Sequence, residues 1–84
     1  MFYLRFFGVE KMSDIRKLIT QIYEEVFERG NEPNDLVLEL LKKSDYDLEK
    51  ILELAGRTLG MEKYTWFCMY LLNWIIHSRF LIAS

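Results

Sequence analysis

The charged residues of this 84-residue chain are confined almost entirely to its middle. Of 24 charged residues, 22 lie between Glu10 and Lys63, and only Arg5 and Arg79 lie outside that stretch. Ten of the 13 aromatic residues lie in the two apolar ends. A chain this short forms one domain and buries roughly 60–65% of its unfolded surface. Its core cannot hide a hydrophobic content of 51%, so we expect the apolar ends to pack on each other or on a second chain.

The overall charge is slightly acidic, with a net charge of −2 and a pI near 5.4. No positive field draws such a chain to phosphate backbones or anionic lipid, so nucleic acid is a disfavoured partner. The one cysteine, Cys68, cannot form an internal disulfide, and the first residues lack the layout of a secretory signal. We therefore expect an intracellular, cytoplasmic protein.

The first twelve residues form an apolar segment that differs from the charged middle of the chain. Residues 1–9, MFYLRFFGV, are rich in strand-favouring types, and Gly8 is a natural stop. The pattern predicts a short extended segment over residues 1–12, followed by a single helical domain over residues 13–84. Met12 is also an alternative start of translation, in which case residues 1–11 are an extension.

The first helix predicted in the middle of the chain runs from Ser13, a favoured N-cap, to Gly30. Glu25 is placed to pair with Arg29 one turn later. Apolar residues recur with the three-and-four spacing of one buried stripe. The stripe consists of Ile15, Leu18, Ile19, Ile22, Tyr23, Val26 and Phe27.

Two shorter amphipathic helices are predicted next. One starts near Pro33 and runs to about Lys43. The other begins at Ser44, with Asp47 at the capping-box position, and ends at Gly60. Their apolar positions are Leu36, Val37, Leu40 and Leu41 in the first, and Leu48, Ile51, Leu52, Ala55 and Leu59 in the second.

The C-terminal helix, predicted from about Met61 to Ala83, is apolar nearly all round. Such a helix lies at the centre of a bundle or in a membrane. A membrane span is not expected, because Asn73, His77 and Arg79 interrupt the apolar run and would each need a partner in lipid. The predicted fold is all-α: a small four-helix bundle with a short N-terminal extended segment and the C-terminal helix most buried.

The residue types that carry catalysis or bind metals are too few for a site. Cys68 and His77 lie nine residues apart on one helix, about 13 Å along its axis, and supply at most two zinc ligands. His77 and Ser78 are adjacent on a helix and point in different directions, which does not suit a base and its nucleophile. We expect no enzymatic activity, no metal and no cofactor.

Two stretches resemble DNA-binding motifs. Residues 2–43, a predicted strand and two helices joined through Gly30, resemble the layout of ribbon-helix-helix repressors over half of the chain. In that family, polar or basic strand residues read the bases, and here only Arg5 could do so. The stretch from Leu54 through Gly60 is similar to a helix-turn-helix, although aromatic residues replace the basic or polar ones expected on its second helix. A DNA-binding regulator is therefore the alternative function.

The main functional expectation arises from apolar surface. The other three predicted helices have one apolar face each and cover only part of the C-terminal helix. A homodimer would bury the remaining stripe. We expect a small acidic regulatory or protein-interaction module that forms a homodimer and docks on a larger protein partner. The predicted interface residues are Phe2, Phe6, Trp66, Tyr70, Asn73, Trp74 and His77.

Overall fold

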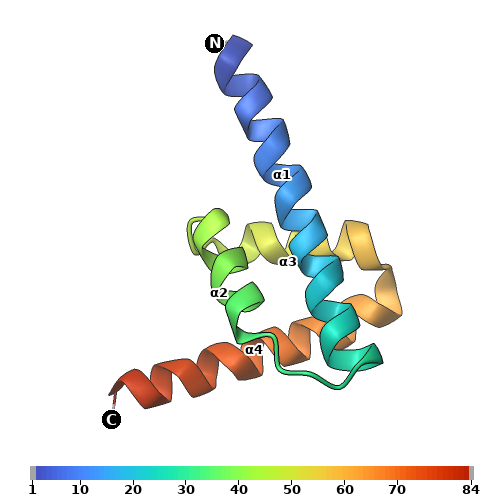
Figure 1. The fold of residues 1–84 in the computed structure, drawn as a ribbon, viewed down its shortest axis with the longest axis vertical. Coiled ribbons are helices and arrows are strands. Elements are labelled where there is room, and N and C mark those ends of the chain that lie inside the picture. Colours follow the sequence, from blue (N-terminus) through green and yellow to red (C-terminus); the bar gives the residue numbers. More distant parts are fainter. Residues whose placement is uncertain (1, 84) are drawn as a thin grey trace.

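The computed structural model describes the backbone of residues 2–83 and the side chains of residues 12–78. The described backbone is all-α, as predicted, and contains no strand. Its helices are α1 (Phe2–Tyr23), α2 (Asn34–Lys43), α3 (Leu48–Leu59) and α4 (Met61–Ala83), and a π-helical turn, η1 (Glu24–Glu28), continues α1. Figure 1 shows the long α1 crossing α3, and α2 lies beside α1. α4 lies at the end of the body away from the N-terminus (Figure 1).

The N-terminal segment is helical, so the predicted extended conformation of residues 1–12 is wrong for the described residues. α1 begins at Phe2 and continues through Ser13, which is therefore not an N-cap. A lone strand leaves its backbone groups unpaired, whereas a helix pairs them within the segment. In Figure 1 this part of α1 and the C-terminal end of α4 extend from the body in different directions. Along the backbone that the structure describes, these two segments therefore lie apart.

The core is built mainly on α1, so the prediction that the C-terminal helix is most buried is wrong. α1 packs against both α2 and α3, whereas α4 packs chiefly against α3 and lies along one side of the body (Figure 1). Among the described side chains, α4 contributes only Phe67 and Leu71 to the core. The other core residues are Ile15, Leu18, Ile19 and Ile22 of α1, Val37, Leu40 and Leu41 of α2, and Ile51, Leu54 and Ala55 of α3.

The turn between α2 and α3 differs from the predicted capping box. Ser44 ends α2, and its buried hydroxyl donates to the carbonyl oxygen of Leu41 at 3.1 Å. Asp45 and Tyr46 come next, with positive φ values of 57° and 60°. Asp47 is the N-cap of α3, because its side chain accepts a hydrogen bond from the backbone of the first turn. The prediction that Ser44 starts this helix is therefore wrong, and the acidic cap lies three residues later.

α3 and α4 are joined by one residue, Gly60, whose φ of +84° turns α4 back against α3. Gly56 in α3 faces Tyr64 of α4, and a Cβ atom at Gly56 would lie 3.6 Å from the tyrosine ring. The small residue therefore lets the ring lie close to the α3 backbone. This hairpin fixes the rotation of α4 and with it the face that α4 turns outward.

Candidate functional site

The described part of α4 has an inner face and an outer face of similar apolar character. Phe67 and Leu71 on the inner face are both 0% exposed. On the outer face, large apolar side chains recur every three or four residues from Trp66 onward and are about half or more exposed. We call these four residues the outer stripe: Trp66 (51% exposed), Met69 (61%), Leu72 (45%) and Ile76 (63%).

The predicted interface residues divide between two surfaces. Trp66, Asn73 and His77 are exposed on α4, whereas Tyr70 and Trp74 are partly buried on the side that faces η1 and α2. Phe2 and Phe6 lie outside the residues whose side chains are described. Sequence reasoning missed Met69, Leu72 and Ile76 of the outer stripe. Apolar residues occur on every face of this helix, so the sequence pattern does not show which face is exposed to solvent.

An aromatic cluster attaches one edge of the outer stripe to η1. Phe27 lies at the centre, with its ring centroid 4.9 Å from that of Tyr23, 6.3 Å from Trp66 and 6.4 Å from Tyr70. The rings are tilted or edge-on, which are favourable arrangements for aromatic pairs. The Nζ atom of Lys63 lies 5.4 Å from the centroid of the Tyr23 ring. Trp66 is therefore held by the cluster on one side while its other side meets water.

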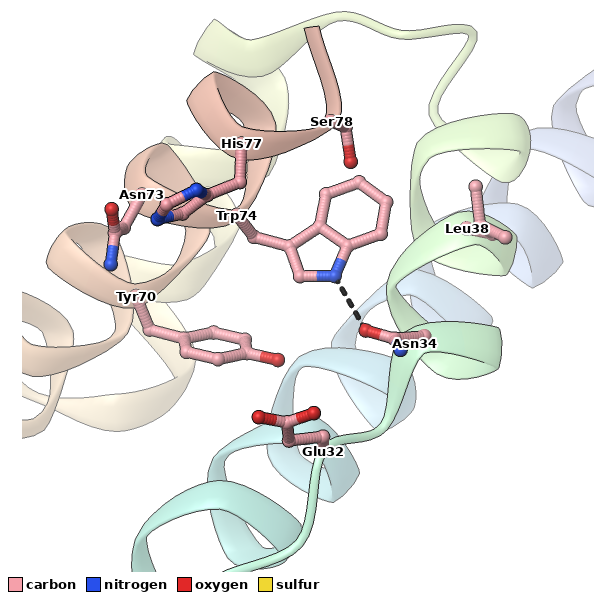
Figure 2. A pocket seen from close by; sticks show the side chains of 8 residues that line it. All are labelled: Glu32, Asn34, Leu38, Tyr70, Asn73, Trp74, His77 and Ser78. Atoms are coloured by element: carbon pink, nitrogen blue, oxygen red, sulfur yellow. Dashed lines mark hydrogen bonds between the residues drawn. The ribbon is translucent and has the colours of Figure 1, made fainter. Parts of the chain in front are cut away.

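A groove of about 590 Å³ separates α4 from the start of α2. We call it the α2–α4 groove; its lining residues are Glu32, Asn34, Leu38, Tyr70, Asn73, Trp74, His77 and Ser78. Figure 2 shows Tyr70 and Trp74 reaching from α4 toward α2 and the loop that precedes it. The indole Nε1 of Trp74 donates to Oδ1 of Asn34 at 2.8 Å, which fixes the orientation of the indole ring.

The electrostatics of the α2–α4 groove are those of a small acidic site. Among the eight described lining residues, Glu32 is the one acidic residue, none is a lysine or an arginine, and His77 is the one histidine. Partial burial and, to a smaller extent, the negative charge of Glu32 raise the pKa of Tyr70. The tyrosine therefore stays protonated and presents its hydroxyl beside a carboxylate (Figure 2).

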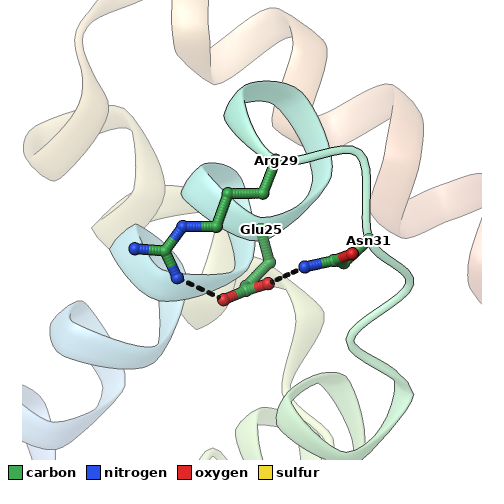
Figure 3. A network of polar contacts seen from close by, with 3 residues as sticks. All are labelled: Glu25, Arg29 and Asn31. Carbon is green, nitrogen blue, oxygen red and sulfur yellow. Dashed lines mark hydrogen bonds and ion pairs between the residues drawn. The ribbon is translucent and has the colours of Figure 1, made fainter.

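The loop that carries Glu32 is held by a polar network, shown in Figure 3. The Glu25 carboxylate accepts a hydrogen bond from Nδ2 of Asn31 at 2.7 Å and one from Nη1 of Arg29 at 2.8 Å. The Glu25 carbonyl oxygen also accepts from the backbone N–H of Asn31 at 2.7 Å. The predicted Glu25–Arg29 pair is confirmed. Hydrogen bonding from Asn31, followed by that from Arg29 and its charge, lowers the pKa of Glu25.

The described residues offer little else for chemistry. Among them, no three His, Cys, Asp or Glu side chains come together in a way that could hold a metal ion. Cys68 is a free, partly buried thiol, and its hydrogen bonding with Tyr64 raises the pKa of that tyrosine. In the part of the chain that the structure describes, no helix is both long and apolar enough to cross a membrane.

The structure corrects both DNA-binding resemblances. Residues 2–10 are helical, so the strand that a ribbon-helix-helix protein inserts into the major groove does not form there, and Arg5 lies on a helix instead of a strand. The side chain of Arg5 itself lies outside the described set. A helix-turn-helix joins its helices by a turn of about 3–4 residues, whereas α3 and α4 are joined by Gly60 alone. Phe67, one of the aromatic residues on the second of these helices, is fully buried.

Comparison with known proteins assigns no family to the chain: no protein-family model, no curated protein and no solved structure matches it. The outer stripe of α4 and the α2–α4 groove are the two candidate binding surfaces of the described residues.

Proposed function

We propose that this chain is a non-enzymatic protein-interaction module that self-associates through the outer stripe of α4. The observation that carries the proposal is the repeated exposure of large apolar side chains along one face of one helix. Contiguous apolar surface of this kind marks interaction sites, and a helix can bury it against a second copy of itself. Asn73 and His77 adjoin the stripe and give it a polar edge, the usual arrangement at an interface.

The expected association is moderate in strength. Burying a large apolar side chain completely is worth about 1.5–3 kcal/mol, and the four residues of the stripe are already about half buried. Two copies of the stripe then provide roughly 6–12 kcal/mol before the cost of association is subtracted. The lost freedom of two associating chains costs about 4–15 kcal/mol. The gain and the cost are of similar size, so we expect the dimer to be weak and reversible, which suits a regulatory module in the cytoplasm that docks on a larger protein.

Sedimentation velocity over a protein concentration series tests the proposal with one matched pair of variants. Leu72 in the outer stripe and Leu38 on α2 are 45% and 43% exposed, so Leu72→Lys and Leu38→Lys make the same change at nearly equal exposure. Lysine is a good helix former, so neither change should break its helix. We expect the wild type and Leu38→Lys to dimerise alike and Leu72→Lys to remain monomeric.

Two outcomes would overturn the proposal. A folded wild type that stays monomeric up to about 1 mM would show that the outer stripe does not drive self-association. Equal weakening by Leu72→Lys and Leu38→Lys would place the contact on another face of the molecule. Circular dichroism of each variant shows whether its helix content, and hence its fold, is intact.

A further inference from the structure

The α2–α4 groove has a chemistry that the outer stripe lacks, and it adjoins the stripe at Asn73 and His77. Its volume of about 590 Å³ is in the usual range of ligand pockets, roughly 300–1,000 Å³, and exceeds what one small ion needs. Its walls come from α4 on one side and from α2 with its preceding loop on the other (Figure 2). An extended segment of another protein can therefore lie in it between the two helices.

The charge of the groove selects the kind of side chain that enters. Among the described lining residues, Glu32 carries a carboxylate and none is a lysine or an arginine, so an acidic ligand would meet the like charge of Glu32. Its polar groups include the Tyr70 hydroxyl, which is directed toward Glu32, and the Ser78 hydroxyl, which is directed toward the groove (Figure 2), beside the side chains of Asn73 and His77. Carboxylate and hydroxyl oxygens accept hydrogen bonds from ammonium and guanidinium groups.

The aromatic walls favour the same ligand. The hydrogen bond to Asn34 holds the Trp74 indole in one orientation, so its face is preorganised at the middle of the groove (Figure 2). Tryptophan is the best aromatic partner for a cation, and an indole face also packs well against an aliphatic stem. Leu38 supplies further apolar surface on the α2 side.

We propose that the α2–α4 groove binds a lysine or arginine side chain of a partner protein, with its aliphatic stem between Trp74 and Leu38 and its charged end at Glu32 and the Tyr70 hydroxyl. This inference rests on the proposed function in that the chain acts by binding proteins, and it names the chemistry of the partner. The four residues of the outer stripe are not among the described residues that line the groove, so variants can test each surface without changing the other.

The chain offers a direct reporter for the groove. It has two tryptophans, so Trp66→Phe leaves Trp74 as its one tryptophan. We would titrate this variant with the peptide acetyl-Ala-Leu-Lys-Leu-Ala-amide and follow Trp74 fluorescence. The matched peptide carries norleucine, which keeps the stem and lacks the charge. We expect saturable binding of the lysine peptide with Kd of about 0.1–1 mM, and binding of the norleucine peptide at least about tenfold weaker.

Substitution of two nearby carboxylates, one at a time, distinguishes a specific contact with Glu32 from a general attraction between acidic residues and the lysine peptide. Glu32 lines the groove, whereas Asp35 lies in the first turn of α2 outside the lining. In the Trp66→Phe background, Glu32→Gln should weaken the lysine peptide about tenfold or more and leave the norleucine peptide unchanged. Asp35→Asn should change lysine peptide binding by less than about twofold, because its carboxylate is not in the groove.

The failure of this inference is distinguishable from the failure of the proposed function. Leu38→Lys adds a positive charge inside the groove and should reduce lysine peptide binding while leaving self-association intact; Leu72→Lys should do the reverse. Equal binding of the lysine and norleucine peptides, equal effects of Glu32→Gln and Asp35→Asn, or no saturation up to about 10 mM peptide would each overturn the groove proposal.

Discussion

The two faces of α4 are built from the same kinds of side chain but have opposite environments. Leu71 and Leu72 are adjacent and identical in type, yet Leu71 is fully buried against the other helices and Leu72 faces outward. A rotation of about 100° along the helix separates them. Composition therefore does not decide which apolar residues form the core of a small domain. The neighbouring helices decide it, and the face that they leave open becomes available for another protein.

The largest predicted effect is on the free energy of unfolding, and it distinguishes these two leucines directly. Leu71→Ala should lower the free energy of unfolding by about 2–5 kcal/mol, because it opens a cavity in the core. Leu72→Ala should change it by less than about 0.5 kcal/mol, the usual size of a surface substitution. Urea unfolding followed by circular dichroism measures both.

The urea experiment is best run at low micromolar concentration, where association through the outer stripe contributes little to stability. At higher concentration, Leu72→Ala should lose the concentration dependence of unfolding that the wild type shows. Equal losses of stability at the two positions would mean that Leu71 and Leu72 are equally buried in solution, and hence that α4 is rotated about its axis.

The contrast between α3 and α4 explains how far the sequence could predict the fold. In α3 the polar residues mark the outer face, and the predicted positions Ile51 and Ala55 are fully buried. In α4 apolar residues occur all round, so periodicity does not identify the buried face. For this reason Trp66, Tyr70 and Trp74, which were predicted for one interface, differ in exposure: Trp66 is exposed, whereas Tyr70 and Trp74 are partly buried.

Other differences between the sequence predictions and the structure arise from contacts between residues far apart in the chain. Strand propensity at the N-terminus has no effect without a partner strand, and the described backbone offers none. The α2–α4 groove pairs Asn34 with Trp74, which lie 40 residues apart, and no local pattern in the sequence connects them. By contrast, Glu25 and Arg29 lie one helical turn apart, so spacing alone was enough to predict their pairing.

A smaller loss of stability is expected when the hydrogen bond that anchors Trp74, at the edge of the inner face of α4, is removed. Asn34→Ala removes the acceptor of the indole hydrogen bond and should lower the free energy of unfolding by about 0.5–1.5 kcal/mol. Asn73→Ala, at an exposed position in the lining of the same groove, is the matched control and should have no measurable effect. In the Trp66→Phe background, Asn34→Ala should also broaden and shift Trp74 fluorescence. An unchanged emission would contradict the anchoring role of Asn34.

The network around Glu25 should contribute a pH-dependent part of the stability. The pKa of the Glu25 carboxyl is lowered from 4.5 in the folded chain, so the unfolded chain binds more protons between the two pKa values. The contribution is therefore complete above pH of about 4.5 and is lost as the pH falls through the lowered pKa. Glu25→Gln should reduce this acid dependence, while Glu24→Gln, next to it but outside the network, should not.

Carboxyl NMR titration identifies the origin of that shift. Asn31→Ala should raise the pKa of Glu25 more than Arg29→Gln does, because the hydrogen bond from Asn31 is the largest cause of the lowered pKa. The reverse order would show that the ion pair dominates and that the loop holding Glu32 is less firmly attached to η1.

The smallest predicted effect concerns Tyr70, which lies at the boundary between the two faces of α4. Burial, and then the charge of Glu32, raise its pKa above 10.0, so the folded chain holds the phenolic proton more tightly than the unfolded chain. This group's contribution to stability is complete below pH of about 10 and is lost as the pH rises from there through the raised pKa.

Tyr70→Phe should be less sensitive to alkali than the wild type in urea unfolding. Glu32→Gln should lower the pKa of Tyr70 only in part, as seen by absorbance at the phenolate band, because burial remains. An ordinary pKa at Tyr70 would mean that this ring is fully solvated, and the boundary between the inner face and the outer stripe would then lie one position further round α4.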